Sequence, residues 1–119
     1  MDISPRSRAP LLEIRRRTRL VKEAVDGLSY EAYLGDLQVQ ASVERHLEVI
    51  GEACRRLTDD ELVIAERIED LRTFIGLRNV IAHGYDRLVQ ETIWEAVTVD
   101  VATLDNQVSR LLDELGEPH

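Results

Sequence analysis

Apolar residues recur along most of this chain at alternating steps of three and four positions. Residues 11–28, 40–57 and 91–115 show the pattern, and residues 74–81 carry a shorter version of it. Such spacing puts apolar side chains on one helical face, and it is typical of helices packed nearly parallel or antiparallel. The sequence therefore predicts an all-α protein, an antiparallel up-and-down bundle of about four main helices.

The apolar stripes identify the expected core of this bundle. They consist of Leu11, Ile14, Thr18, Val21, Val25 and Leu28; of Val43, Leu47, Ile50, Cys54 and Leu57; of Phe74, Ile75, Leu77, Val80 and Ile81; and of Ile93, Val97, Val101, Leu104, Val108, Leu111 and Leu115. Trp94 is expected to pack at the start of the last helix, and His46, beside the second stripe, to lie on the surface.

Glycine and small polar residues mark the expected breaks between helices. Gly27 with Ser29, and Gly35 with Asp36, bracket a short connection at residues 30–34. Thr58 followed by Glu61 has the spacing of a capping box, which predicts that a new short segment opens there.

The length of 119 residues suits one domain. Residues 1–9, rich in Arg, Ser and Pro, are predicted to be a flexible N-terminal arm, and residues 10–116 a single helical domain. The one cysteine, Cys54, excludes an internal disulfide and a cysteine-based zinc site. We find no signal-peptide-like run and no stretch of membrane-spanning length, so we expect a cytoplasmic protein without membrane contact.

The net charge of −8 excludes nucleic-acid binding through the overall field of the protein, so any contact with RNA has to be local. Asp36, Glu44, Glu48 and Glu52 could suggest a carboxylate metal site, but acids at such spacing are more often a solvated helix face, and we assign no metal.

The candidate chemistry lies in residues 77–85, which read Leu-Arg-Asn-Val-Ile-Ala-His-Gly-Tyr. Arg78 can hold charge on a phosphate, and His83 can exchange a proton near neutral pH. Asp70 is expected to cap the helix that carries them, and Gly84 to end it in a left-handed conformation.

The two side chains do not share one helical face. At 100° per residue, Arg78 and His83 are about 140° apart around an ideal helix. They can act together if the helix ends at His83, or if a second copy of the chain completes the site. The sequence thus hints at a site at a helix end and at a subunit interface.

These residues resemble the HepT-like family of HEPN domains, whose signature is Arg, four residues, His, one residue and Tyr. The match is Arg78, His83 and Tyr85, and the flanks agree: residues 43–53, Val-Glu-Arg-His-Leu-Glu-Val-Ile-Gly-Glu-Ala, and residues 93–98, Ile-Trp-Glu-Ala-Val-Thr, are similar to other helices of the family. The resemblance covers roughly residues 11–115.

The resemblance implies a HEPN-like homodimer with metal-independent endoribonuclease activity, the toxin of a type II toxin–antitoxin pair. Arg78 and His83 would be the catalytic pair, with Asn79 and Glu52 as supporting residues. Tyr85 would be adenylylated by an MNT-type nucleotidyltransferase antitoxin, which uses ATP, while the toxin itself needs no cofactor. The substrate would be RNA, with tRNA and mRNA both open.

Other interpretations of the same residues stay open at this point. Arg78 can form an ion pair with Glu52, which could also orient its guanidinium, and His83 can serve as a cap that bonds terminal carbonyls. The chain could also be a HEPN subunit without nuclease activity that positions a substrate for its nucleotidyltransferase partner, or a plain helical adaptor.

Overall fold

The computed structural model describes residues 5–83 and 87–119, and within these two ranges the chain consists of helices joined by short turns, with no strand. Gly84 and Tyr85, for which the sequence predicts a cap and a modification site, lie outside the described residues. The elements are η1 (Pro5–Ser7), α1 (Arg8–Val25), α2 (Tyr30–Leu34), α3 (Leu37–Asp60), α4 (Leu62–Ala65), α5 (Leu71–Ala82), α6 (Arg87–Glu95), η2 (Ala96–Asp100) and α7 (Val101–Glu114).

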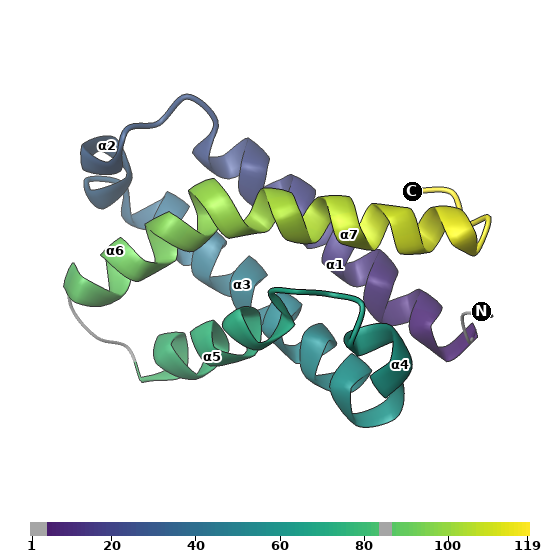
Figure 1. Cartoon of the computed structure of the whole chain (residues 1–119). Helices are drawn as coiled ribbons and strands as arrows, with labels where there is room; N and C mark the ends of the chain where they lie inside the picture. Colours follow the sequence, from purple (N-terminus) through teal and green to yellow (C-terminus); the bar gives the residue numbers. More distant parts are fainter. Residues whose placement is uncertain (1–4, 84–86) are drawn as a thin grey trace.

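The long helices form the predicted antiparallel bundle. α1 packs against α3 and α7, and α3 packs in turn against α5. Figure 1 shows that α1, α3, α5 and the rod of α6, η2 and α7 alternate in direction, with α2 at one end of the molecule and α4 toward the other. The all-α fold class is therefore confirmed.

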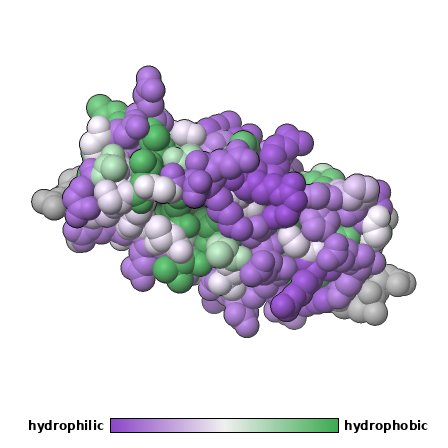
Figure 2. Space-filling model, turned by 90° about the horizontal axis from the view of Figure 1, so that it is seen from above, coloured by the Kyte–Doolittle hydropathy of each residue, from purple (hydrophilic) through white to green (hydrophobic). Residues whose placement is uncertain are grey.

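The predicted stripes form the core. Nearly all of their residues are buried, and Val25, Leu28, Ile75, Val80 and Leu115 are partly buried at its edges. Cys54 is fully buried, and burial raises the pKa of its thiol to about 12, which makes it an inert core residue, as expected. Seen from above, the surface is mostly hydrophilic, with apolar side chains gathered toward the left half (Figure 2).

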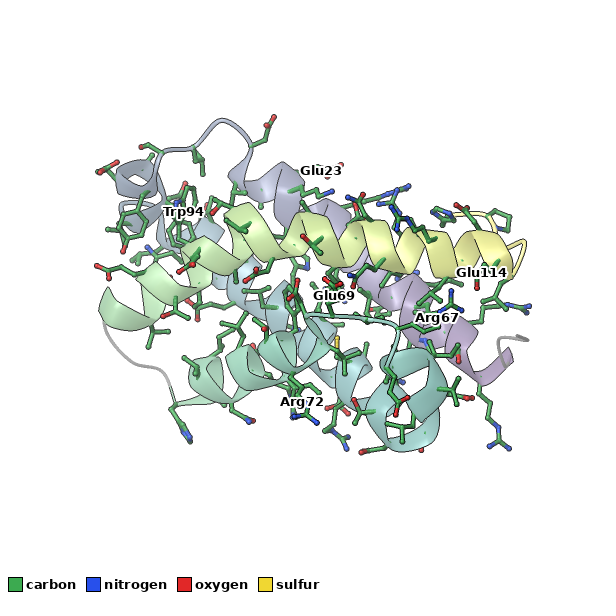
Figure 3. The ribbon with its side chains drawn as sticks, in the orientation of Figure 1. Glu23, Arg67, Glu69, Arg72, Trp94 and Glu114 are labelled. Carbon is green, nitrogen blue, oxygen red and sulfur yellow. The ribbon has the colours of Figure 1, made fainter. Side chains whose placement is uncertain are left out.

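Residues 30–34, predicted as a connection, fold instead into the short helix α2. The Ser29 side chain caps it by accepting a hydrogen bond from the Ala32 amide at 3.1 Å. Tyr33 on α2 is fully buried against Trp94, with ring centroids 5.0 Å apart. This aromatic contact anchors α2 to the end of α6, where Trp94 lies (Figure 3), several residues after the helix begins and not at its start as expected.

The predicted capping box at Thr58 and Glu61 is wrong. α3 continues to Asp60, and the Thr58 hydroxyl donates a hydrogen bond to the Cys54 carbonyl one turn earlier, at 3.1 Å. Thr58 therefore lies inside α3 and caps nothing, although a short segment, α4, does open after Glu61 as predicted. Asp70 does precede α5, but its side chain makes no capping hydrogen bond.

The folded domain begins earlier than the sequence indicates. Residues 5–9, assigned to an N-terminal arm, form η1 and the first residues of α1, and Ser7 is buried. Pro10 fits the first turn of α1, where the backbone amide needs no partner. Arg8 pairs with Glu117 at 2.9 Å, which ties the start of the chain to its end.

A buried carboxylate joins α1 to α7. Asp105 on α7 is 4% exposed and accepts hydrogen bonds from Arg15, from Thr18 at 3.1 Å and from Lys22 at 2.6 Å. Burial alone would raise the pKa of this carboxyl, but the hydrogen bonds and charges of Lys22 and Arg15 outweigh it and hold the pKa below its usual range.

A second ion pair holds the turn after α4. Arg67 binds both carboxylate oxygens of Glu114 on α7, at 2.6 and 2.8 Å, and the two side chains point toward one another in Figure 3. Within the part of the chain that the structure describes, no helix combines the length and the apolar character needed to cross a membrane.

Candidate active site

Arg78 is brought to α3 by a close approach of two helices. A Cβ atom added at Gly51 on α3 would lie 2.8 Å from the Arg78 Cβ and 2.8 Å from the Phe74 carbonyl oxygen on α5. The missing side chain of Gly51 thus permits this packing. Phe74 and Leu77 are buried on the same helix and fix its rotation, so the Arg78 side chain extends along the surface of α3.

There Arg78 meets Glu52, the partner that the sequence suggested. The Arg78 Nη2 atom lies 3.4 Å from the Glu52 Oε2 atom, and the two side chains are 41% and 35% exposed. The pair holds the guanidinium in place while leaving much of it open to solvent. Arg78 can therefore still receive an anion such as a phosphate.

Glu52 is itself fixed by a second arginine. Arg55 donates hydrogen bonds to both of its carboxylate oxygens, at 2.7 and 3.2 Å. The hydrogen bonds from Arg55 lower the pKa of Glu52, and the charges of Arg55, Arg78 and Arg56 lower it further. Glu52 is therefore ionised at neutral pH and oriented toward Arg78.

His83 stands at the end of the same helix. The last residue of α5 is Ala82, and the His83 amide donates a hydrogen bond to the Val80 carbonyl at 3.2 Å in the closing turn. His83 is exposed. The structure thus meets one condition for a joint role of Arg78 and His83, because the helix ends where the sequence indicated. Asn79 is exposed on α5, about 100° around the helix from Arg78.

A groove surrounds Arg78, with a volume of about 430 Å³ between α1, α3 and α5. Besides Ala9 and Val49, its walls consist of three arginines and three glutamates, namely Arg45, Arg56, Arg78, Glu13, Glu48 and Glu52. We call it the arginine groove. Sequence reasoning missed Arg45 and Arg56 as site residues, although their helical spacing from Glu52 places them on its face of α3.

A chain of hydrogen bonds joins α6, the helix that follows residues 84–86, to α2 and α3. The Tyr33 hydroxyl on α2 donates to the Gln90 side-chain carbonyl on α6, and the Gln90 amide donates to Glu44 on α3 at 2.9 Å. Burial, then Glu44 and Tyr30, raise the pKa of Tyr33, so its hydroxyl stays a donor. This link therefore fixes α6, which begins at Arg87, against α2 and α3.

His46 differs from its expected surface position. It is half-buried on α3, and its Nδ1 atom lies 3.0 Å from the Arg17 Nη1 atom. Burial lowers the pKa of His46, and the charges of Arg17 and Arg45 lower it further. His46 is therefore neutral at pH 7 and belongs to the contact between α1 and α3.

Three of the four carboxylates that could have suggested a metal site have other partners. Asp36 caps α3 by accepting from the Val39 amide at 3.1 Å, Glu44 accepts from Gln90, and Glu52 pairs with arginines. In residues 5–83 and 87–119, no three His, Cys, Asp or Glu side chains are grouped so that they could hold a metal ion.

Comparison with known proteins gives a consistent result. A family model described as "Ribonuclease HepT-like" matches residues 14–111. A protein of Caldanaerobacter subterraneus provisionally named an RNase is 27% identical over 106 residues, which cover 88% of this chain and 94% of that protein. Another provisionally named RNase, from Methanocaldococcus jannaschii, is 27% identical, with 85% of this chain and 92% of that protein covered.

A third relative is named "probable ribonuclease HepT" and comes from Thermococcus cleftensis. It is 28% identical over 101 residues, which cover 85% of this chain and 91% of that protein. No solved structure matches the chain significantly.

Proposed function

We propose that this chain, which belongs to the HepT-like ribonuclease family, is a toxin endoribonuclease that cuts RNA with Arg78 and His83. The observation that carries the proposal is the placement of Arg78. Its guanidinium is held at the surface by Glu52 and stays 41% exposed, on the helix that ends at the exposed His83. A fixed cation and an accessible imidazole are the groups that RNA cleavage requires.

RNA supplies its own nucleophile, the 2′-hydroxyl group. A ribonuclease therefore needs a base for the proton of that hydroxyl, an acid for the leaving 5′-oxygen, and positive charge on the phosphate. In the proposed reaction one imidazole takes the 2′-hydroxyl proton as the 2′-oxygen bonds to phosphorus. A second, protonated imidazole gives its proton to the 5′-oxygen as the P–O5′ bond breaks. The products are a 2′,3′-cyclic phosphate and a 5′-hydroxyl.

The two imidazoles are His83 of one protomer and His83 of a second copy. One chain has one histidine in the motif, and on α5 the Arg78 side chain is turned toward Glu52 of α3 while His83 follows the end of the helix. A homodimer built on the α5 helices would bring two motifs to one scissile bond. Arg78 would stabilise the negative charge that grows on the phosphate oxygens.

Cleavage of single-stranded RNA in the presence of EDTA tests this proposal. We expect the wild-type protein to cut, with 2′,3′-cyclic phosphate ends, and Arg78→Ala and His83→Ala to lose most of the activity while their circular dichroism spectra stay helical. Products with 3′-hydroxyl ends, or a requirement for added Mg²⁺, would contradict the mechanism. An inactive wild-type dimer would favour the subunit that only positions substrate for a nucleotidyltransferase.

The proposal extends to regulation through Tyr85. An MNT-type nucleotidyltransferase antitoxin would transfer AMP from ATP to the Tyr85 hydroxyl, which loses its proton as pyrophosphate leaves. The added phosphate would lie two residues from His83 and could pair with Arg78 in place of RNA. We expect Tyr85→Phe to cut RNA and to resist silencing by the antitoxin with ATP. Silencing of Tyr85→Phe under those conditions would overturn this part.

A further inference from the structure

The arginine groove extends beyond Arg78 in both directions along α3. Its floor is formed by Arg45, Val49, Glu52 and Arg56, which follow one another at steps of four, three and four and so share one face of the helix. Arg45 and Arg56 are about three turns apart, roughly 16 Å along the helix axis. A stacked strand rises about 3.4 Å per nucleotide, so this length covers a few nucleotides.

Arg78 sits between these two arginines. It packs on Gly51 and pairs with Glu52, which follow Arg45 and precede Arg56 on α3. The three cations therefore form a row in which the proposed catalytic arginine is flanked on both sides. A row of this kind fits consecutive phosphates of one strand better than a single small anion.

The carboxylates of the groove are largely neutralised by arginines. Glu52 is bound by Arg55 and Arg78, and Glu13 lies 3.1 Å from Arg17 and 3.6 Å from Arg16. Among residues 5–83 and 87–119, neither Arg45 nor Arg56 forms an ion pair within 4.0 Å. The charges available to a ligand are thus the two outer arginines and the exposed part of Arg78, opposed by Glu48.

We propose that the arginine groove binds the backbone of single-stranded substrate RNA, with Arg45 and Arg56 contacting the phosphates on either side of the one held by Arg78. This assignment rests on the proposed ribonuclease function. It also explains how a chain with a net charge of −8 can hold RNA, because the attraction is confined to one row of cations. A groove of about 430 Å³ has room for part of one strand.

The test measures binding separately from cleavage. Full-length wild type, Arg45→Ala, Arg56→Ala and the double variant are titrated with a 2′-O-methylated single-stranded RNA, which lacks the nucleophile, at several salt concentrations. Each phosphate contact removed should lower the slope of log affinity against log salt by about 0.7, which corresponds to about fourfold weaker binding near physiological salt. The double variant should lose about 1.4 from the slope.

Matched variants guard against indirect effects. Arg72→Ala removes the same charge from α5 at an exposed position outside the groove, where Figure 3 shows Arg72 on the lower side of the helix. Its salt slope should stay that of the wild type. Arg45→Lys with Arg56→Lys keeps both charges and should keep the slope, whereas Glu48→Gln should bind RNA more tightly.

The outcomes separate this inference from the proposed function. A slope that is unchanged in both Arg45→Ala and Arg56→Ala overturns the groove assignment even if the wild type cleaves RNA. If instead these variants lose binding to a nucleotidyltransferase partner and not to RNA, the groove is a protein-docking surface and the assignment also fails. If the variants lose slope relative to the wild type, but the wild type does not cleave RNA, the result supports the groove assignment and contradicts the nuclease mechanism.

Discussion

Gly51 and Arg78 occupy adjoining positions on α3 and α5, with room between them for a hydrogen atom and not for a methyl group. An added Cβ would lie 2.8 Å from the Arg78 Cβ and 2.8 Å from the Phe74 carbonyl oxygen, which is backbone and cannot move aside alone. The side chain that we assign to the phosphate is therefore positioned by the absence of a side chain on the neighbouring helix.

Gly51→Ala should push α5 away from α3 and displace Arg78. Overpacking at such a contact costs about 1 to 3 kcal/mol in the free energy of unfolding, and a shift of a catalytic group by about 1 Å can lower kcat by about a hundredfold. Urea unfolding and RNA cleavage measure the two effects. Gly76→Ala on α5 is the control, because nothing lies within 4 Å of an added Cβ there. It should stabilise the protein by up to about 1 kcal/mol and leave cleavage unchanged.

Glu52→Gln should separate two roles of this carboxylate. If Glu52 orients Arg78, its loss should lower kcat by about tenfold, an effect of about 1.4 kcal/mol on the barrier. Removing its negative charge from the groove should at the same time tighten RNA binding. The value of kcat would then fall while the affinity for RNA rises. An increase in kcat would instead show that Glu52 competes with the phosphate for Arg78.

The features that could be predicted are those that depend on residues close together in the sequence. The periodic stripes predicted the bundle and its core, and the sequence also predicted that the motif helix ends near His83, which is where α5 ends. The pairing of Arg78 with Glu52 was also suggested by the sequence and is found in the structure.

The features that the sequence did not reveal depend on contacts between distant parts of the chain. The buried Asp105 had no counterpart in the sequence analysis, because only the fold brings Arg15 and Lys22 against it. The bond between Tyr33 and Gln90, and the meeting of α3 with α1 at the arginine groove, depend in the same way on how helices rotate and cross. At Thr58, the capping pattern fails because the hydroxyl bonds to the Cys54 carbonyl within α3, which continues to Asp60.

Asp105→Asn should reveal how far the buried ionic contact supports the fold. The folded-state pKa of Asp105 lies below its unfolded value of about 3.9, so the carboxylate contributes stability above that pH and loses it as the pH falls through the folded pKa. The variant leaves Arg15 and Lys22 without their charged partner and should lose about 3 kcal/mol at neutral pH.

Urea unfolding at pH 7 and at acid pH measures this difference. The difference in the free energy of unfolding between wild type and Asp105→Asn should shrink as the pH falls below about 4. Asp113→Asn, at an exposed position of the same helix, should change stability by less than about 1 kcal/mol at either pH. A gap between Asp105→Asn and wild type that is constant over this pH range would contradict the assigned role.

Gln90→Ala should weaken the packing of α6 against α2 and α3. The variant leaves the buried Tyr33 hydroxyl without its acceptor, which costs about 1 to 3 kcal/mol, and removes the link from α6 to Glu44. In the double variant Tyr33→Phe with Gln90→Ala no hydroxyl is stranded, so it should be less destabilised than the sum of the two single variants. Hydrogen exchange should show faster opening at the start of α6 in Gln90→Ala, because the bonds that fix Gln90 to α2 and α3 are those removed. If the destabilisation in the two single variants simply adds up in the double variant, and hydrogen exchange at the start of α6 is unchanged, the link does not hold α6 in place.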